Sequence, residues 1–113
     1  MYEFRVINLT ATPLPAHSVV RWNKWFPVNG DIDTEEIDVS GLAPFTLSAT
    51  REIRPAPASS ITLDYWGYWI NNVVKTKEYE LKIKTGDRYI LVAISDYGFS
   101  VIVTHTAPDT WQW

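Results

Sequence analysis

Apolar and polar residues alternate with a period of two at several points along this chain, and this alternation constrains its fold more than any other feature. The segment 79–84 reads YELKIK, and the segment 45–50 reads FTLSAT. Such alternation is typical of a β-strand with one buried face and does not match the 3.6-residue period of a helix. Both segments are therefore predicted to be strands.

Six further segments are rich in β-branched or aromatic residues, and turn signals containing glycine or proline separate them. These segments are 2–10, 17–22, 34–39, 60–70, 88–95 and 99–105. Together, the eight segments predict an all-β protein, an antiparallel two-layer β-sandwich of about eight strands. A chain of 113 residues is long enough for one core, so we expect a single domain over residues 1–113.

Residues 78–105 carry the clearest local prediction. The turn signals KTGD at 84–87 and SDYG at 95–98 separate three strand segments, which predicts a three-stranded antiparallel meander. The last two of these segments are apolar on both faces. That pattern is typical of strands covered on each side, either between two sheets or against a neighbouring subunit.

Composition and charge exclude several classes of function. The chain has no cysteine and a net charge of −3, and its basic residues are scattered, which argues against a disulfide framework, a thiolate metal site and a nucleic-acid partner. The acidic run over 31–38 fails the EF-hand pattern, because Glu36 stands where glycine is required and Leu42 where the bidentate glutamate belongs. No metal or cofactor is predicted.

Two further expectations concern membrane insertion and catalysis. The sequence shows no basic, apolar leader at its start and no run of eighteen apolar residues, so we expect no membrane span and a protein that is cytoplasmic or secreted without a visible signal peptide. His17 and His105 lie far apart, and no nucleophile, zinc or phosphate-loop motif is present. We expect a protein that is not an enzyme.

The stretch DYWGYW at 64–69 holds four aromatic residues in six positions. Alternation along 60–70 places residues 61, 63 and 65 toward the core and residues 64, 66 and 68 on the opposite face. Aromatic rings stack on the C–H face of a sugar, while carboxylates and amides bind its hydroxyls. We therefore predict a lectin-like carbohydrate-binding surface. Its predicted ligand-binding residues are Asp64, Trp66, Tyr68, Asn71 and Asn72.

Two alternatives remain open for the aromatic residues. Trp22, Trp25 and Phe26 lie among basic residues, as in a tip that contacts lipid headgroups. Trp111 and Trp113, near the chain end, could instead belong to an interface in a structural or interaction protein. Because one shallow sugar site binds weakly, a glycan or glycolipid ligand would favour a homo-oligomer, and peripheral membrane contact stays open.

The stretch GDIDTE at 30–35, with tryptophans upstream and a Tyr-Trp cluster downstream in a small acidic β protein, resembles the aegerolysins. That family consists of lipid-binding β-sandwich proteins that can serve pore formation. The resemblance implies a lipid-binding or membrane-active function, which is the first of the two alternatives. It transfers no functional residue to this chain.

Overall fold

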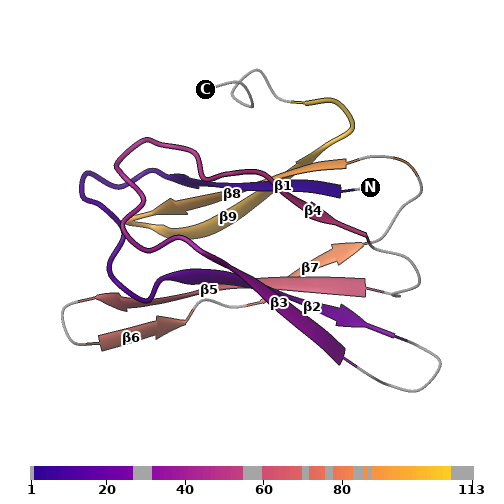
Figure 1. The fold of residues 1–113 in the computed structure, drawn as a ribbon, viewed down its shortest axis with the longest axis horizontal. Helices are drawn as coiled ribbons and strands as arrows, with labels where there is room; N and C mark the ends of the chain where they lie inside the picture. The colour runs from indigo at the N-terminus through magenta and orange to yellow at the C-terminus, as the bar shows by residue number, and fades with distance from the viewer. Residues whose placement is uncertain are drawn as a thin grey trace.

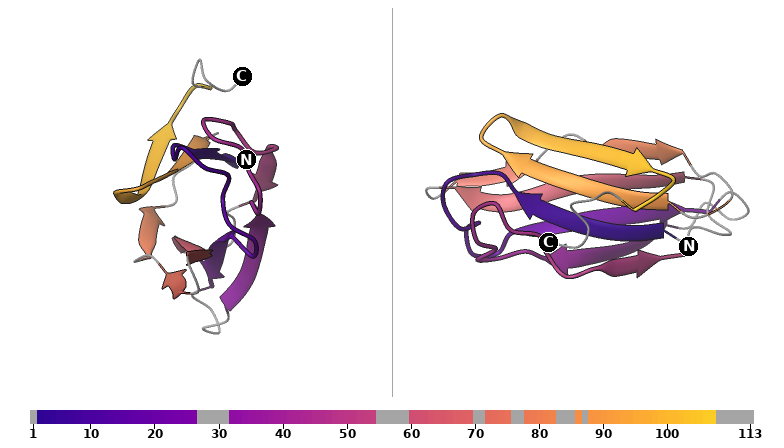
Figure 2. Two further views of the ribbon diagram at one scale, coloured as in Figure 1. Left: turned by 90° about the vertical axis from the view of Figure 1, so that its left-hand side faces the viewer. Right: turned by 90° about the horizontal axis from the view of Figure 1, so that it is seen from above.

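The computed structural model describes residues 2–26, 32–54, 60–69, 72–75, 78–82, 86 and 88–107. These residues form nine β-strands and no helix, arranged in two sheets that pack face to face (Figure 1). The predicted two-layer β-sandwich is confirmed. Figure 2 shows the two layers end-on and from above.

The upper sheet in Figure 1 has four strands. In spatial order they are β4 (Arg51–Ile53), β1 (Tyr2–Asn8), β8 (Arg88–Ser95) and β9 (Gly98–Thr104). β1 pairs antiparallel with β4 but parallel with β8, so the sandwich is antiparallel in all but this one pair. The pairing of β1 with β8 joins segments from opposite ends of the chain.

The lower sheet has five strands, of which four lie in the order β3-β2-β5-β6. Their bounds are β2 (Val19–Trp25), β3 (Ile32–Asp38), β5 (Ser60–Trp69) and β6 (Asn72–Lys75), and the fifth strand is β7 (Tyr79–Lys82). β5 is the longest strand of the sandwich. All pairings in this sheet are antiparallel.

The predicted meander over 78–105 is only half right. β8 and β9 form the expected hairpin, but β7 pairs with β5 in the other sheet. The physical reason is the length of β5: β6 pairs with its second half, from Trp66 to Trp69, and leaves the backbone groups of its first half open. β7 satisfies those groups by pairing with residues 60–63.

The predicted strand over 45–50 is wrong. Phe45 has a φ of 54°, in the left-handed region, and only Leu47 forms a bridge, with Ile7 of β1. The buried residue of this segment is Ser48, which exchanges hydrogen bonds with the backbone of Val6 at 2.7 and 2.9 Å. The segment therefore runs beside β1 through a few backbone bonds and the bond to the Ser48 hydroxyl, without forming a regular strand, and the ring of Phe45 faces solvent. The sequence analysis also missed the short strands β4 and β6.

The core lies between the sheets and is apolar and aromatic. Trp22 of β2 has no exposed surface, and its ring lies 5.5 Å from that of Phe4 of β1, between centroids. The expected core face of β5 is confirmed, because Ile61, Leu63 and Tyr65 are all buried. The prediction that Trp22 faces lipid is therefore wrong, since alternation along β2 directs this ring inward while Arg21 points outward.

Replacement of Trp22 should be far more damaging than replacement of Trp25, which lies on the outer face of the same strand. We expect Trp22→Ala to lower the free energy of unfolding by about 3–5 kcal/mol because it leaves a large cavity. Trp25→Ala should cost under about 1 kcal/mol because Trp25 is exposed. Urea unfolding of both variants measures this difference, and equal losses would contradict the assigned faces of β2.

Candidate functional site

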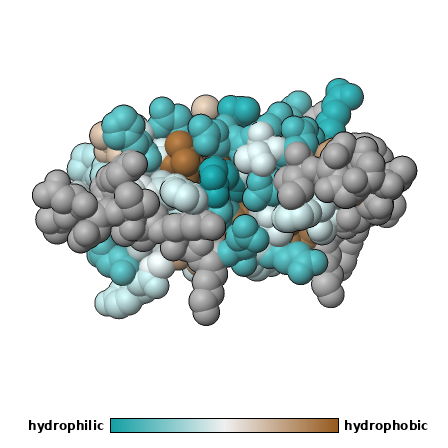
Figure 3. All heavy atoms as spheres, turned by 90° about the horizontal axis from the view of Figure 1, so that it is seen from below, coloured by the Kyte–Doolittle hydropathy of each residue, from teal (hydrophilic) through white to brown (hydrophobic). Residues whose placement is uncertain are grey.

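The outer face of the lower sheet gathers the polar and aromatic residues that sequence reasoning singled out. The pairing of β2 with β5 sets Arg21 opposite Asp64 and Val19 opposite Trp66. The pairing of β2 with β3 sets Arg21 opposite Glu36 as well. Three strands thus bring a cation, carboxylates and an indole onto one surface. Figure 3 shows this face, on which hydrophilic residues predominate.

Arg21, Asp64 and Trp66 form one cluster. The guanidinium of Arg21 donates from Nε and Nη2 to the two carboxylate oxygens of Asp64, at 3.2 and 3.0 Å. Its Cζ also lies 4.3 Å from the centroid of the Trp66 ring, and Trp66 Nε1 donates to Asp64 at 3.4 Å. The hydrogen bonds with Asp64 raise the pKa of Arg21 above its ordinary value. The cluster fixes the plane and position of the Trp66 indole.

A groove with a cavity volume of about 500 Å³ runs beside Trp66, and we call it the Trp66 groove. Its size falls in the range of small-molecule sites. Its lining combines an indole, a cation, two exposed carboxylates and a hydroxyl. The lining residues are His17, Val19, Arg21, Glu36, Asp38, Ser40, Trp66 and Gly67.

Asp38 presents an ionised carboxylate at the rim of the Trp66 groove. The backbone N–H of Ser40 donates to Asp38 Oδ1 at 2.9 Å. Hydrogen bonds from the side chain and backbone of Ser40 lower the pKa of Asp38, and the nearby His17 lowers it further. Asp38 therefore remains a hydrogen-bond acceptor at neutral pH and well into the acid range.

Gly67 lines the groove, and its lack of a side chain leaves space on the core side of β5. A Cβ atom at position 67 would lie 2.5 Å from the hydroxyl of Tyr65, so no larger residue fits without displacement. That hydroxyl donates to Ser18 Oγ at 3.1 Å, and burial raises the pKa of Tyr65. Gly67 thus makes room for a buried hydrogen bond directly below the groove.

The predicted sugar-binding residues differ in whether their side chains reach the groove. Trp66 lines the groove, whereas the side chain of Asp64 has no exposed surface and engages Arg21 with both oxygens. Asp64 therefore positions Arg21 and Trp66 and does not reach a ligand. Asn71 lies outside the described residues, as do the side chains of Tyr68 and Asn72.

The other predicted aromatic residues are dispersed. Trp25 is exposed at the far end of β2, where its Nε1 donates to Thr62 Oγ1 at 3.3 Å, and Phe26 beside it is half-buried. Trp111 and Trp113 lie outside the described residues. Trp25 is six positions along β2 from Val19, the partner of Trp66, so the two outer indoles do not share one site.

Sequence reasoning did not assign Glu36, Asp38 and Ser40 to the site. Alternation along 34–38 does predict that Thr34, Glu36 and Asp38 share one face, but the acidic run was considered only as a calcium loop. Only the pairing of β3 with β2 sets that face beside Trp66. The sequence predicts which residues of β3 share a face, but it does not predict which strands lie beside that face.

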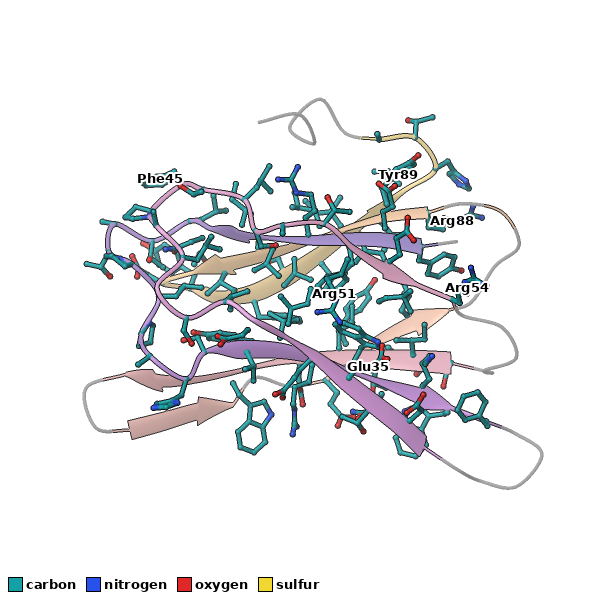
Figure 4. The ribbon with its side chains drawn as sticks, viewed as in Figure 1. Glu35, Phe45, Arg51, Arg54, Arg88 and Tyr89 are labelled. Atoms are coloured by element: carbon teal, nitrogen blue, oxygen red, sulfur yellow. The ribbon has the colours of Figure 1, made fainter. Side chains whose placement is uncertain are left out.

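A second surface lies at the end of the sandwich where β1 finishes. Leu9, Phe45 and Tyr97 are exposed there, and we call this surface the apolar end. Backbone hydrogen bonds join its loops, from Leu9 N to Ile94 O at 2.7 Å and from Phe45 N to Asn8 O at 2.6 Å. Figure 4 shows Phe45 on the outside of the molecule at this end.

The loops of the apolar end are held firmly and carry little charge. The buried side chain of Asn8 donates to the carbonyls of Thr12 and Leu42 at 2.9 and 2.8 Å. Residues 6–16 and 39–50 contain no Asp, Glu, Lys or Arg. Phe45 keeps 64% of its surface exposed while its backbone adopts a strained left-handed conformation.

The described part of the chain shows neither a metal-binding cluster nor a membrane-spanning helix. In the ranges that the structure covers, no group of three or more His, Asp or Glu side chains is placed to hold a metal ion. Over the same residues, no helix has the length and apolar character needed to cross a bilayer.

Comparison with known proteins finds a likeness of fold only. No family model matches the chain, and no curated protein matches it by sequence. Three solved structures match over 93% of this chain: a disulfide-locked mutant of intermedilysin with human CD59, the human-specific toxin intermedilysin, and a Gram-negative toxin. Their respective identities are 10, 10 and 14%, and their TM-scores are 0.45, 0.46 and 0.44. The chain spans about a quarter of the length of each of these proteins (24, 23 and 23%). Because the identities and TM-scores are this low, no function is transferred from these proteins to the chain.

The Arg21–Asp64 pair should contribute measurably to stability through direct coupling. A double-mutant cycle with Arg21→Ala, Asp64→Ala and both changes together should give a coupling energy of about 1–2 kcal/mol. This is below the cost of breaking a fully buried pair, since Arg21 keeps 27% of its side chain exposed. Urea unfolding measures the cycle, and a coupling energy near zero would show that the two side chains act independently.

Proposed function

We propose that this protein is a non-enzymatic carbohydrate-binding module that binds its ligand in the Trp66 groove. The observation that carries the proposal is an indole, held in place by Arg21, beside the exposed carboxylates of Glu36 and Asp38. A pyranose ring presents C–H groups that pack on an indole and hydroxyls that donate to carboxylates. The groove combines both kinds of contact.

The charge of the groove supports a hydroxyl-rich, uncharged ligand. Arg21 is already bonded to Asp64, and the rim carries the carboxylates of Glu36 and Asp38. An anionic ligand would meet these carboxylates, whereas hydroxyl groups can donate to them. The mainly hydrophilic face around the groove also favours a sugar over an acyl chain on this sheet (Figure 3).

The state of Asp38 supports binding without hydrolysis. A glycosidase needs one carboxylic acid that stays protonated near neutral pH so that it can protonate the leaving group. Hydrogen bonds from Ser40 shift the pKa of Asp38 in the opposite direction. Asp38 is therefore suited to accept hydrogen bonds from a sugar and unsuited to act as the acid.

Replacement of Trp66 tests the proposal. A folded protein applied to a broad glycan array should give hits that share one sugar, and Trp66→Ala should weaken that binding by tenfold or more, as expected for a central aromatic contact (about 2 kcal/mol). Titration calorimetry with the best sugar measures the change. Asp38→Asn, which keeps the shape but removes the charge, should weaken binding less.

Trp25→Ala is the matched control, because it removes an outer-face indole that lies away from the groove. It should leave sugar binding unchanged, and circular dichroism should show that all variants keep their fold. A blank array with folded protein, or equal losses for Trp66→Ala and Trp25→Ala, would rule out the Trp66 groove as a sugar site.

A second candidate function is peripheral contact with a membrane through the apolar end. The observation that favours it is Phe45, which the fold holds outside at the cost of backbone strain, beside two loop segments, 6–16 and 39–50, that contain no Asp, Glu, Lys or Arg. Exposed apolar and amphipathic side chains partition into the bilayer interface, and a neutral surface fits zwitterionic headgroups. This surface replaces the set containing Trp22 as the lipid-facing region.

Phe45→Gly separates the effect of the strained backbone on stability from the effect of the exposed ring on membrane binding. Glycine tolerates positive φ, so stability should stay the same or rise by about 1 kcal/mol. Loss of the ring should lower partitioning onto phosphatidylcholine vesicles by about tenfold, since burial of an apolar side chain contributes about 1.5–3 kcal/mol. Vesicle co-sedimentation measures the partitioning, with Trp25→Ala as the control. Unchanged partitioning of Phe45→Gly, or no binding of the wild type, would exclude this function.

A further inference from the structure

Strand β9 ends the upper sheet, and it has no second neighbour among the described strands. It pairs with β8 along its full length, from Gly98 to Thr104. In an antiparallel sheet, alternate residues of an edge strand direct their N–H and C=O groups away from the sheet. β9 therefore offers a row of backbone donors and acceptors to another extended chain.

β9 lacks the features that usually protect an edge strand. Its sequence, GFSVIVT, contains no charged residue and no proline, although lysine and proline commonly block edge pairing. Ile102 keeps 50% of its surface exposed on the outer face, and Val103 is exposed as well. The strand is long, apolar and open in the part of the molecule that the structure describes.

A groove between the sheets adjoins this edge. It has a cavity volume of about 320 Å³, and it lies between the edge formed by β9 and strand β7 of the lower sheet. Val103 lines it from β9, and Tyr79 and Leu81 line it from β7. Arg88, at the start of β8, also lines the groove. A chain added to β9 would therefore gain side-chain contacts in addition to backbone bonds.

We propose that β9 pairs with β9 of a second copy of this chain in an antiparallel, two-fold symmetric dimer. The absence of charge on β9 supports this occupant, because two identical strands meet without like-charge repulsion even though each chain carries a net charge of −3. The apolar residues Val101 to Val103 are self-complementary. The paired sheets form one continuous sheet across the dimer.

The hairpin geometry limits the registers that a β9–β9 pair can adopt. Ser95 and Gly98 close a two-residue turn and form a hydrogen-bonded pair, so the backbone groups of Phe99, Val101 and Val103 point away from β8. We place the two-fold axis at Val101, the central residue of β9, because this register pairs the strand along its full length, and it sets Val103 opposite Phe99 of the second copy. That ring lies at the mouth of the groove that Val103 lines. The same register sets Ile102 opposite Ser100 of the second copy.

Two double variants test both the interface and its register, and both change only exposed residues. In S100K/I102K, the lysine introduced at position 102 faces the lysine introduced at position 100 of the second copy, about 5 Å away between Cβ atoms. In S100E/I102K, the lysine at position 102 faces a glutamate instead, and the net charge stays at −3 because one acid and one base are added. The first should dissociate the dimer, and the second should preserve it.

Sedimentation equilibrium over micromolar to submillimolar concentrations measures the outcome. The wild type and S100E/I102K should approach twice the chain mass of 13.0 kDa, and S100K/I102K should raise the dimer dissociation constant by about tenfold or more. A wild type that remains monomeric overturns the proposal. A dimer that persists in S100K/I102K excludes β9 as the interface, and equal dissociation of both variants excludes the register. Loss of sugar or vesicle binding does not affect this readout.

Discussion

The antiparallel pairing of β2 with β5 is the interaction on which the rest of this structure depends. It joins residues that lie about 40 positions apart and sets Trp22 and Leu63 into the core while Arg21 and Asp64 meet on the outer face. The same register therefore builds the core and the candidate site. A shift of β5 by one residue would turn Leu63 outward and Asp64 toward the core, and it would separate Asp64 from Arg21.

Asp64 shows how a carboxylate in a sugar-binding pattern can serve a structural purpose. Its side chain is removed from water, and its charge is balanced by the bidentate contact with Arg21. The contact also holds the guanidinium against Trp66, so the position of the indole depends on a carboxylate that does not reach the ligand. Rigid aromatic contacts lower the entropic cost of binding, which gives this arrangement a functional value in the proposed module.

The Trp66 groove, the apolar end and the β9 edge differ in chemistry and lie on different parts of the sandwich. The Trp66 groove is polar and lies on the outer face of the lower sheet, whereas the apolar end carries little charge and is built from loops. The β9 edge offers backbone hydrogen bonds on the upper sheet. Because they do not overlap, a β9 dimer would carry two copies of each remaining surface, and two weak sites on one particle bind with higher avidity.

Much of the fold was predictable from the sequence because alternation, β-branched residues and turn signals are local properties. They identified the all-β class, most of the strands and the core face of β5 without knowledge of any partner. Local patterns failed at two points. Phe45 begins an alternating segment, but hydrogen bonds between Ser48 and β1 bury the hydroxyl and leave the ring outside. The turn signal after β7 predicted that β7 pairs with β8, but β7 pairs with the first half of β5 in the other sheet.

The sequence by itself determined that this chain folds into strands with an aromatic, uncharged core, and that Trp66 stands on the outer face of its strand. Only the tertiary structure decided which residues meet there. Pairing between distant strands made Asp64 a buried partner of Arg21, brought Glu36 and Asp38 beside Trp66, and left β9 at an edge. The physical reason is that the side-chain period sets the face of each residue, whereas the choice of neighbouring strand depends on backbone hydrogen bonds satisfied across the whole sheet.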